Sequence, residues 1–153
     1  MHVAFLDRDG TLIHEPPDGL VRPEEFRVLS GVTEGLRALK AQGFTLVMIT
    51  NQSFLGSSER QMCFEKTQEM LFSALKHAGL AFDFVFFCPH SEAEDCNCRK
   101  PKTGMVDEFL REHEINKARS FIVGDRESAD GGLARAIGVR YLKMEPNGTF
   151  PLF

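Results

Sequence analysis

Short apolar runs alternate with stretches of helical periodicity along most of this chain. Five runs are rich in branched and aromatic side chains, and they cover residues 3–6, 45–49, 84–87, 121–123 and 139–142. None shows polar alternation, which is typical of strands buried on both faces in a parallel sheet. The pattern predicts five buried parallel strands.

Between these runs the apolar residues recur at helical spacing. Val32, Leu36 and Leu39 form one such stripe, which is followed by Gly43 as a stop signal. Three further helical patterns cover residues 59–78, 106–110 and 133–137. Strands that alternate with helices indicate βαβ units, so we expect an α/β fold whose sheet has helices on both faces.

The remaining segments are short. Residues 14–27 contain three prolines and a glycine, which predicts a loop with one short hairpin. No insertion is large enough for a cap domain or a second domain, so we expect one domain over residues 1–153.

Composition and charge narrow the function class. The 42% hydrophobic and 26% charged content is ordinary for a globular protein, and no apolar run reaches a membrane-spanning length of about 18 residues. Charge at Asp7 and Arg8 interrupts any signal peptide, so we expect a cytoplasmic protein. A net charge of −4 without a basic stripe argues against nucleic acid but permits a small anionic substrate. The oligomeric state is not revealed, with a monomer slightly favoured.

Polar side chains follow several of the predicted strands at their carboxyl ends. Asp7 and Asp9 follow the first strand, Thr50 and Asn51 the second, and Asp125 the fourth. Ligands of open α/β sheets bind outside the carboxyl ends of the strands. The fold should therefore bring these groups, and the cations Arg99 and Lys100, to one crevice.

Paired carboxylates at a strand end suit phosphoryl transfer. Asp7 can attack phosphorus and form an aspartyl-phosphate, while Asp9 can protonate the leaving alcohol and then activate water. Mg²⁺ suits a site with few carboxylates and a phosphate, and Asp7, Asp125 and the Asp9 carbonyl are its predicted ligands. We expect phosphoryl oxygens to be bound by four side chains: Thr50, Asn51, Arg99 and Lys100.

The order of these motifs resembles the haloacid dehalogenase (HAD) superfamily of phosphatases. Four motifs carry the resemblance along nearly the whole chain: residues 7–11, Thr50-Asn51, Lys100, and Gly124-Asp125 with Asp130. The resemblance implies a Rossmann-like fold and the roles given above. It also implies that Asp130 helps to order the metal site.

A second cluster combines cysteines with a histidine. Cys88 and His90 are followed by Cys96 and Cys98, and each pair is spaced so that it can chelate from one side. Three thiolates and one imidazole make a closed tetrahedral zinc site, which is structural. We expect zinc to pin this loop and hold Arg99 and Lys100 over the crevice. Cys63 lies in a helical pattern and is predicted to be a packing residue.

The cysteine signature resembles two groups of HAD phosphatases that lack a large cap. One acts on histidinol phosphate in histidine biosynthesis, and the other acts on D-glycero-D-manno-heptose 1,7-bisphosphate. The short loop between His90 and Cys96, together with residues 15–17, 46–52 and 98–102, resembles the histidinol-phosphate group, and we expect histidinol phosphate as the substrate. Residues 22–26 and 103–105 look more like the heptose group, which is the alternative. The spacing from Asp125 to Asp130 is one residue longer than is usual in the histidinol-phosphate group.

Physical chemistry offers one discriminator between these substrates. The amine and imidazole of histidinol phosphate call for a carboxylate, which Glu15 could supply in a substrate loop that also includes Ser53. A sugar bisphosphate calls for a second cationic site, to which Arg22 and Lys102 could contribute. Surface exposure is the default for these charged residues.

Two other classes of protein fit parts of the pattern. A receiver domain also has a parallel sheet and a phosphorylated aspartate, but its acceptor follows the third strand, where this chain has Cys88 and His90. A zinc-stabilised binding module would leave the strand-end carboxylates unexplained. Repeated phosphate release would distinguish an enzyme from both alternatives.

Overall fold

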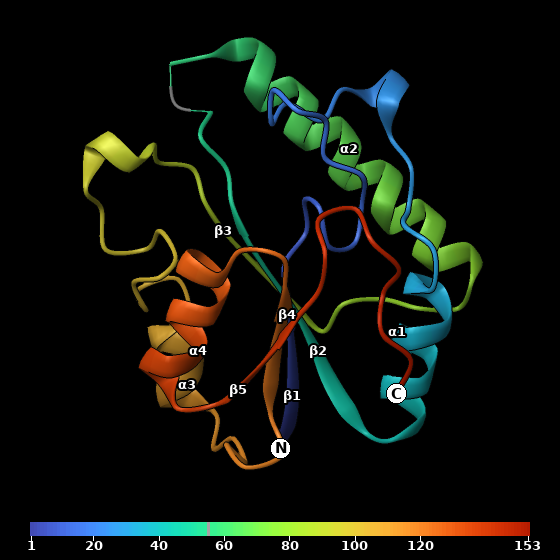
Figure 1. The fold of residues 1–153 in the computed structure, drawn as a ribbon, viewed down its shortest axis with the longest axis vertical. Helices are drawn as coiled ribbons and strands as arrows, with labels where there is room; N and C mark the ends of the chain where they lie inside the picture. The colour runs from blue at the N-terminus through green and yellow to red at the C-terminus, as the bar shows by residue number, and fades with distance from the viewer. Residues whose placement is uncertain (55) are drawn as a thin grey trace.

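The computed structural model describes residues 1–54 and 56–153, and its centre is a five-stranded sheet (Figure 1). The strands are β1 (His2–Leu6), β2 (Phe44–Asn51), β3 (Phe84–Cys88), β4 (Phe121–Gly124) and β5 (Arg140–Lys143). They lie in the order β3-β2-β1-β4-β5, and every neighbouring pair is parallel. The five predicted strands are therefore confirmed, as is the α/β class.

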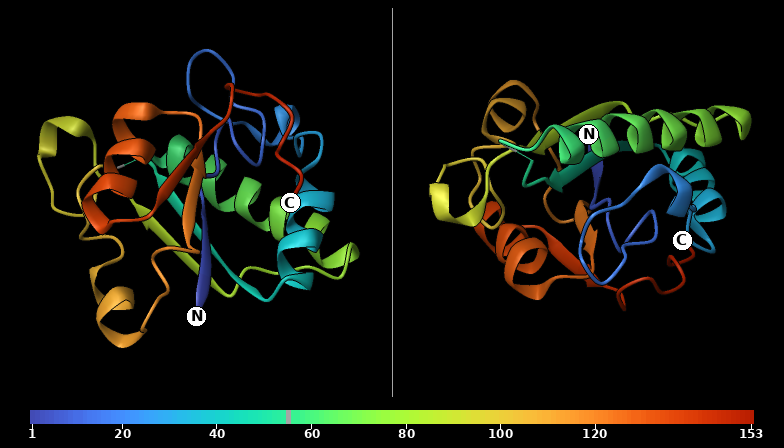
Figure 2. Two further views of the ribbon diagram at one scale, coloured as in Figure 1. Left: turned by 60° about the horizontal axis from the view of Figure 1, so that its bottom comes forward. Right: turned by 90° about the horizontal axis from the view of Figure 1, so that it is seen from above.

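Helices cover both faces of this sheet, as the periodicity predicted (Figures 1 and 2). Helices α1 (Val32–Ala41) and α2 (Ser58–His77) pack on one face, against β-strand residues such as Leu6 and Met48. Helices α3 (Asp107–Glu112) and α4 (Gly132–Ile137) pack on the other face, against Phe5 and Ile49. In the described residues, no insertion of cap-domain size interrupts this alternation.

The prediction that all five strands are buried is wrong for the two edge strands. Phe87 on β3 is 44% exposed, and Arg140 and Lys143 on β5 are exposed as well. Each of these strands has a sheet neighbour on one side only among the described residues, so part of its surface faces solvent. The central strands β1 and β4 are buried almost throughout.

The segment after β1 folds back over the carboxyl ends of the strands. Residues 12–14 pair with residues 27–29 through backbone bonds, including His14 N–H to the Arg27 carbonyl oxygen at 3.0 Å. A short 3-10 helix, η1 (Pro23–Glu25), lies in the loop between the paired segments. The predicted loop with a short hairpin is thus present, and it covers the carboxyl ends of the strands.

None of the helices described for this chain combines the length and the apolar character needed to cross a membrane.

Candidate active site and thiol cluster

Three buried carboxylates meet at the carboxyl ends of the two central strands. Asp7 follows β1 and Asp125 follows β4. The Asp7 N–H donates to the Val123 carbonyl oxygen at 3.0 Å, so the ends of the two strands lie side by side. With Asp130 they offer ligand atoms that all lie within 4.8 Å of one another. Sequence positions more than a hundred residues apart are therefore brought together by the parallel pairing of β1 and β4.

Lys100 neutralises part of this carboxylate cluster. Its Nζ donates to Asp7 Oδ1 and Asp130 Oδ1, each at 2.7 Å, and to the Ile49 carbonyl oxygen at 3.1 Å. The side chain is almost fully buried. One ammonium against three carboxylates leaves a formal surplus of two negative charges when all are ionised.

Burial is the main cause of the pKa shifts of two carboxyl groups in this cluster. Burial raises the pKa of Asp7 to about 8, although the nearby ammonium of Lys100 opposes the shift. Burial also raises the pKa of Asp125. For Lys100, burial favours the neutral amine, but Asp7 and Asp130 outweigh it and raise the pKa. Negative charge is thus concentrated where water can stabilise it poorly.

The donor set fits a divalent cation. Asp125 Oδ1 is buried and has no hydrogen-bond partner among the described residues, although buried polar atoms are normally satisfied. A hard cation that prefers oxygen ligands would satisfy this atom and balance the surplus charge.

Asp130 reaches the cluster from a π-helical turn, η3 (Glu127–Gly131), that precedes α4. Its Oδ2 accepts from the Arg126 N–H at 3.1 Å. Such turns hold one more residue than an α-helical turn and are frequent at functional sites. This turn sets the path of the chain from Asp125 to Asp130. Gly124 makes room for the Asp130 carboxylate, because a Cβ at position 124 would overlap it.

The Asp9 carboxylate points away from the other three. Its Oδ1 accepts from Arg8 Nε at 2.7 Å, and its Oδ2 accepts from Gln52 Nε2 at 2.8 Å and from Arg8 Nη2 at 3.2 Å. It is therefore separate from the carboxylate cluster, in keeping with a proton-transfer role. Metal binding through its backbone carbonyl stays a prediction.

Thr50 and Asn51 occupy the end of β2, beside the cluster. Thr50 Oγ1 accepts from Gln52 Nε2 at 2.9 Å. The Asn51 amide holds the backbone of Lys100, accepting from its N–H at 2.9 Å and donating to its carbonyl oxygen at 3.1 Å. In this structure Asn51 therefore positions Lys100, and phosphate binding by Thr50 and Asn51 stays a prediction.

A cleft of about 300 Å³ opens above these groups. Arg99 lines it and donates to Ser53 Oγ at 3.2 Å and to the His90 carbonyl oxygen at 3.0 Å. Glu15 lines the opposite loop, where its Oε1 accepts from Arg126 Nη2 at 2.6 Å. Both predicted substrate-loop residues, Glu15 and Ser53, thus lie at or beside the cleft.

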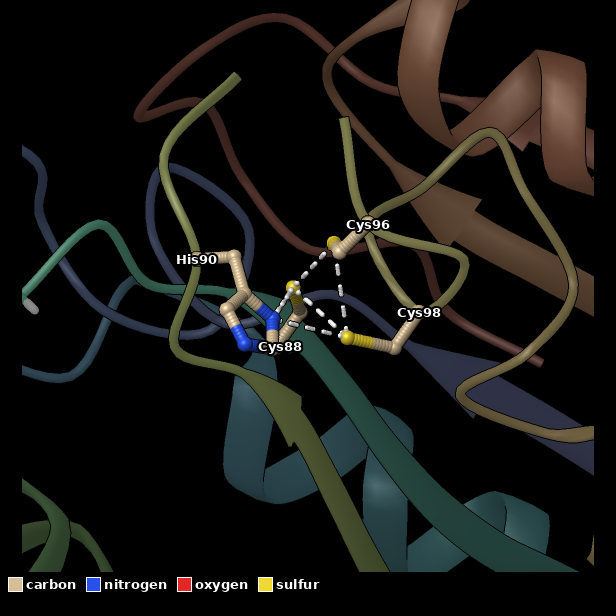
Figure 3. Close-up of side chains that lie close together, drawn as sticks. All are labelled: Cys88, His90, Cys96 and Cys98. Atoms are coloured by element: carbon tan, nitrogen blue, oxygen red, sulfur yellow. Dashed lines mark hydrogen bonds between the residues drawn. The ribbon is translucent and has the colours of Figure 1, made fainter. Parts of the chain in front are cut away.

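The second cluster, which we call the thiol cluster, consists of Cys88, His90, Cys96 and Cys98. Its four side chains converge, as Figure 3 shows. Cys88 Sγ lies 3.0 Å from Cys98 Sγ and 3.5 Å from Cys96 Sγ, and His90 Nδ1 lies 3.2 Å from Cys98 Sγ. The sulfur separations exceed the roughly 2.05 Å of a disulfide. Four soft or borderline ligands facing one point fit a closed tetrahedral metal site.

The thiols of this cluster differ in acidity. Burial raises the pKa of Cys88 to about 12. Burial also opposes ionisation of Cys96, but hydrogen bonds from Cys88 and from backbone N–H groups outweigh it and lower its pKa to about 6. Cys96 is therefore predisposed to the thiolate form that metals bind. Cys63 lies apart from the cluster, buried within α2, as predicted.

Backbone bonds join the thiol cluster to the cleft. The Cys88 carbonyl oxygen accepts from the Gln52 N–H at 2.7 Å, and the His90 carbonyl oxygen accepts from Arg99. Gln52 in turn contacts Asp9 and Thr50. The loop that holds these ligands is therefore in contact with two residues that line the cleft, with the backbone of Gln52 and with the side chain of Arg99.

The role of Arg8 and its partners was not predicted from the sequence. Arg8 is 1% exposed, and its Nη1 contacts Gln68 Oε1 at 3.2 Å and Thr67 Oγ1 at 3.4 Å on α2. One signal was available, because Gln68 is a polar residue within the apolar stripe that includes Phe64, Leu71 and Leu75. A buried polar residue in such a stripe needs a partner.

Comparison with known proteins places this chain in one family. The family model for polynucleotide kinase 3 phosphatase matches residues 2–143. The histidine biosynthesis bifunctional protein HisB of Campylobacter jejuni subsp. doylei is 43% identical over 144 residues, covering 92% of this chain and 41% of that protein. The HisB protein of Legionella pneumophila (strain Lens) is 35% identical over 152 residues, covering 98% of this chain and 43% of that protein.

A solved structure of a phosphatase has a similar fold. A D,D-heptose 1,7-bisphosphate phosphatase from B. bronchiseptica, complexed with magnesium and phosphate, superposes with a TM-score of 0.80 at 28% identity, covering 92% of this chain and 79% of that one. Fold and sequence similarity thus define a HAD-type phosphatase. The chain belongs to the polynucleotide kinase 3 phosphatase family, and it spans about two fifths of the length of the curated HisB relatives.

Proposed function

We propose that this protein hydrolyses histidinol phosphate to histidinol and inorganic phosphate, with Mg²⁺ bound at the carboxylate cluster. The observation that carries the proposal is the combination of three buried strand-end carboxylates with a cleft whose outer loop presents further carboxylates. The sequence similarity to HisB proteins supports the choice of substrate.

Asp7 is the proposed nucleophile. An oxygen of its carboxylate forms a bond to phosphorus as the bond from phosphorus to the alcohol oxygen breaks, and Asp9 gives its proton to that oxygen. Asp9 then takes a proton from water, whose oxygen bonds to phosphorus as the bond from phosphorus to the Asp7 oxygen breaks, which releases phosphate and restores the Asp7 carboxylate. Lys100, which lies 2.7 Å from Asp7 Oδ1, balances charge on the transferring group.

Asp7 and Asp125 are the proposed ligands of Mg²⁺, with Asp130 in support. The buried, unpartnered Asp125 Oδ1 and the surplus negative charge support this assignment. A bound Mg²⁺ supplies charge neutralisation for the carboxylates and the phosphoryl oxygens. The magnesium and phosphate in the heptose bisphosphate phosphatase structure are consistent with it.

Zinc is the proposed occupant of the thiol cluster. Its four ligands leave no open position for substrate, so its contribution is structural. The bonds from the Cys88 and His90 carbonyl oxygens to Gln52 and Arg99 support a role in fixing the cleft.

The surroundings of the cleft favour a substrate with a cationic group. Glu15 and Asp18 line it. Asp18 is paired with Arg22. Among the described residues Glu15 binds Arg126 through Oε1 only, so its Oε2 could face an amine or an imidazolium. Arg22, which a second phosphate would need, forms ion pairs with Asp18 at 2.9 Å and Glu25 at 3.4 Å. Lys102 likewise pairs with Asp95, at 2.5 Å.

Hydrolysis of the heptose bisphosphate is the second candidate. Arg60, from the first turn of α2, and Arg99 both line the cleft and could contact a second phosphate. The similarity to the heptose bisphosphate phosphatase from B. bronchiseptica supports this alternative.

A panel assay tests the proposal. Phosphate release is measured with histidinol phosphate, the heptose bisphosphate and simple phosphomonoesters, with Mg²⁺ and with EDTA. We expect Mg²⁺-dependent turnover with the highest kcat/KM on histidinol phosphate, and Lys102→Met should leave that value within about twofold, since exposed pairs contribute little. A higher kcat/KM on the bisphosphate, lowered by Arg60→Met, would favour the second candidate.

A further inference from the structure

We propose that Arg8 is a positioning residue for proton transfer, holding the Asp9 carboxylate against α2 in the orientation that acid and base chemistry require. The inference rests on the proposed phosphomonoesterase function and adds a residue to its machinery. Arg8 has no contact with the carboxylate cluster among its described bonds, so it would act through Asp9.

The burial of Arg8 indicates a specific task. Its side chain is 2% exposed, and a charge taken out of water is tolerated only with a partner and satisfied hydrogen bonds. The charge partner is Asp9, whose side chain is 13% exposed and therefore remains accessible from the cleft. An arginine is well suited to this contact, because its planar fork matches a carboxylate with two parallel bonds.

The guanidinium is fixed on both of its edges. One edge binds Asp9 through Nε and Nη2, and the other binds Thr67 and Gln68 through Nη1. The Phe64 ring lies 4.9 Å from Cζ, so an aromatic face supports the cation as well. Helix α2 has 20 residues and packs on the sheet. Through Arg8, the position of the Asp9 carboxylate is therefore fixed by this helix as well as by its own loop.

The contacts leave one oxygen of Asp9 available for proton exchange. A carboxylate oxygen offers about two acceptor positions. Oδ2 uses both, since it accepts from Gln52 and Arg8, whereas Oδ1 accepts only from Arg8 among the described residues. Oδ1 is therefore the oxygen with an acceptor position left to face the leaving oxygen in the first step and the attacking water in the second.

A purely structural role is the competing explanation, because a buried arginine could serve only to attach α2. The leaving group separates the two roles. p-Nitrophenyl phosphate releases a phenolate that is stable as an anion, whereas p-nitrobenzyl phosphate releases an alkoxide that must be protonated. Lost positioning of the acid lowers kcat/KM for the benzyl ester selectively, and a distorted fold lowers both.

The test measures kcat and KM for both esters with Mg²⁺ in the wild type, Arg8→Met, Arg8→Lys and Asp9→Asn. We expect Arg8→Met to lower kcat/KM for the benzyl ester by about 10- to 100-fold, a part of the 10²- to 10⁴-fold that general acid catalysis supplies. The loss should lie in kcat and should stay below about threefold for the phenyl ester. Arg8→Lys keeps the charge but not the fork, so it should show the same selectivity with a smaller loss.

Two further variants make the result decisive. Adding Arg8→Met to Asp9→Asn should cost nothing more, because the two residues act as one unit. Arg37→Met, at an exposed position on α1, is the matched control and should match the wild type on both esters. If Arg8→Met does not fold, the selectivity of Arg8→Lys decides the question. Equal losses on the two esters would overturn the proposal, and a wild type inactive on both esters and on histidinol phosphate would overturn the proposed function itself.

Discussion

The carboxylate cluster and the thiol cluster are both candidate metal sites, but the chain builds them differently. Asp7, Asp125 and Asp130 come from opposite ends of the sequence and meet because β1 and β4 are sheet neighbours. The thiol cluster comes from one short stretch, residues 88–98, that begins at the last residue of the edge strand β3. One site is therefore a product of topology and the other of local spacing.

The surroundings of the two clusters differ as well. The carboxylate cluster is buried, contains a lysine and lies under a cleft of about 300 Å³, so a substrate can reach it. The thiol cluster offers four ligands that face one another, and its carbonyl oxygens bond outward to Gln52 and Arg99. Chemistry is expected at the first cluster and mechanical support at the second, and the two can be disturbed separately.

The largest expected effect is on the carboxylate cluster. Asp7→Asn should lower turnover by roughly 10⁴- to 10⁶-fold, as removal of a covalent nucleophile does. The zinc content should be unchanged, since the thiol cluster shares no ligand with this site. Steady-state phosphate release and metal analysis of the same preparation check both statements. Asp107→Asn, at the start of α3, is the matched control and should keep wild-type activity. Retained activity in the Asp7 variant would exclude an aspartyl-phosphate.

A smaller effect is expected from the thiol cluster. Cys96→Ser should release the metal and lower kcat by about 10- to 100-fold, the range seen when groups that orient a site are lost. Hydrogen exchange should become faster in the backbone of residues 88–104, and the stabilisation by Mg²⁺ should persist. Cys63→Ser removes a thiol outside the cluster and should keep the metal. A metal-free Cys96→Ser protein with normal turnover would show that the cluster does not support Arg99 and Lys100.

The same contrast explains what the sequence could reveal. The thiol cluster was readable from spacing alone, because all four ligands lie within eleven residues. The carboxylate cluster was readable because Asp7 and Asp125 directly follow apolar runs, and parallel strands bring their carboxyl ends to one edge. Both predictions needed only local pattern and one rule of topology.

Other features depend on packing between distant elements. The contact of Arg8 with Thr67 and Gln68 requires that α2 cross above the first strand, which no local pattern specifies. The engagement of Asn51 with the Lys100 backbone depends on the path of the thiol loop. The exposure of β3 and β5 follows from strand order, and a list of apolar runs does not contain that order.

The smallest expected effects come from two glycines, one beside each cluster. A Cβ at position 124 would overlap the Asp130 carboxylate, and one at position 104 would lie 2.5 Å from the Asn97 carbonyl oxygen. Each substitution by alanine should cost about 1–3 kcal/mol of stability, the usual cost of overpacking. Thermal unfolding with and without Mg²⁺, together with zinc content, measures both variants.

The two variants should differ in which metal they affect. Gly124→Ala should reduce the rise in Tm that Mg²⁺ produces, because Asp130 is displaced, and it should leave zinc bound. Gly104→Ala should weaken zinc retention, because it displaces the backbone between Asn97 and Cys98, and it should leave the Mg²⁺ response intact. If either variant changed both metals equally, the two clusters would form one cooperative unit, and the bonds through Gln52 and Arg99 would be the connection to examine.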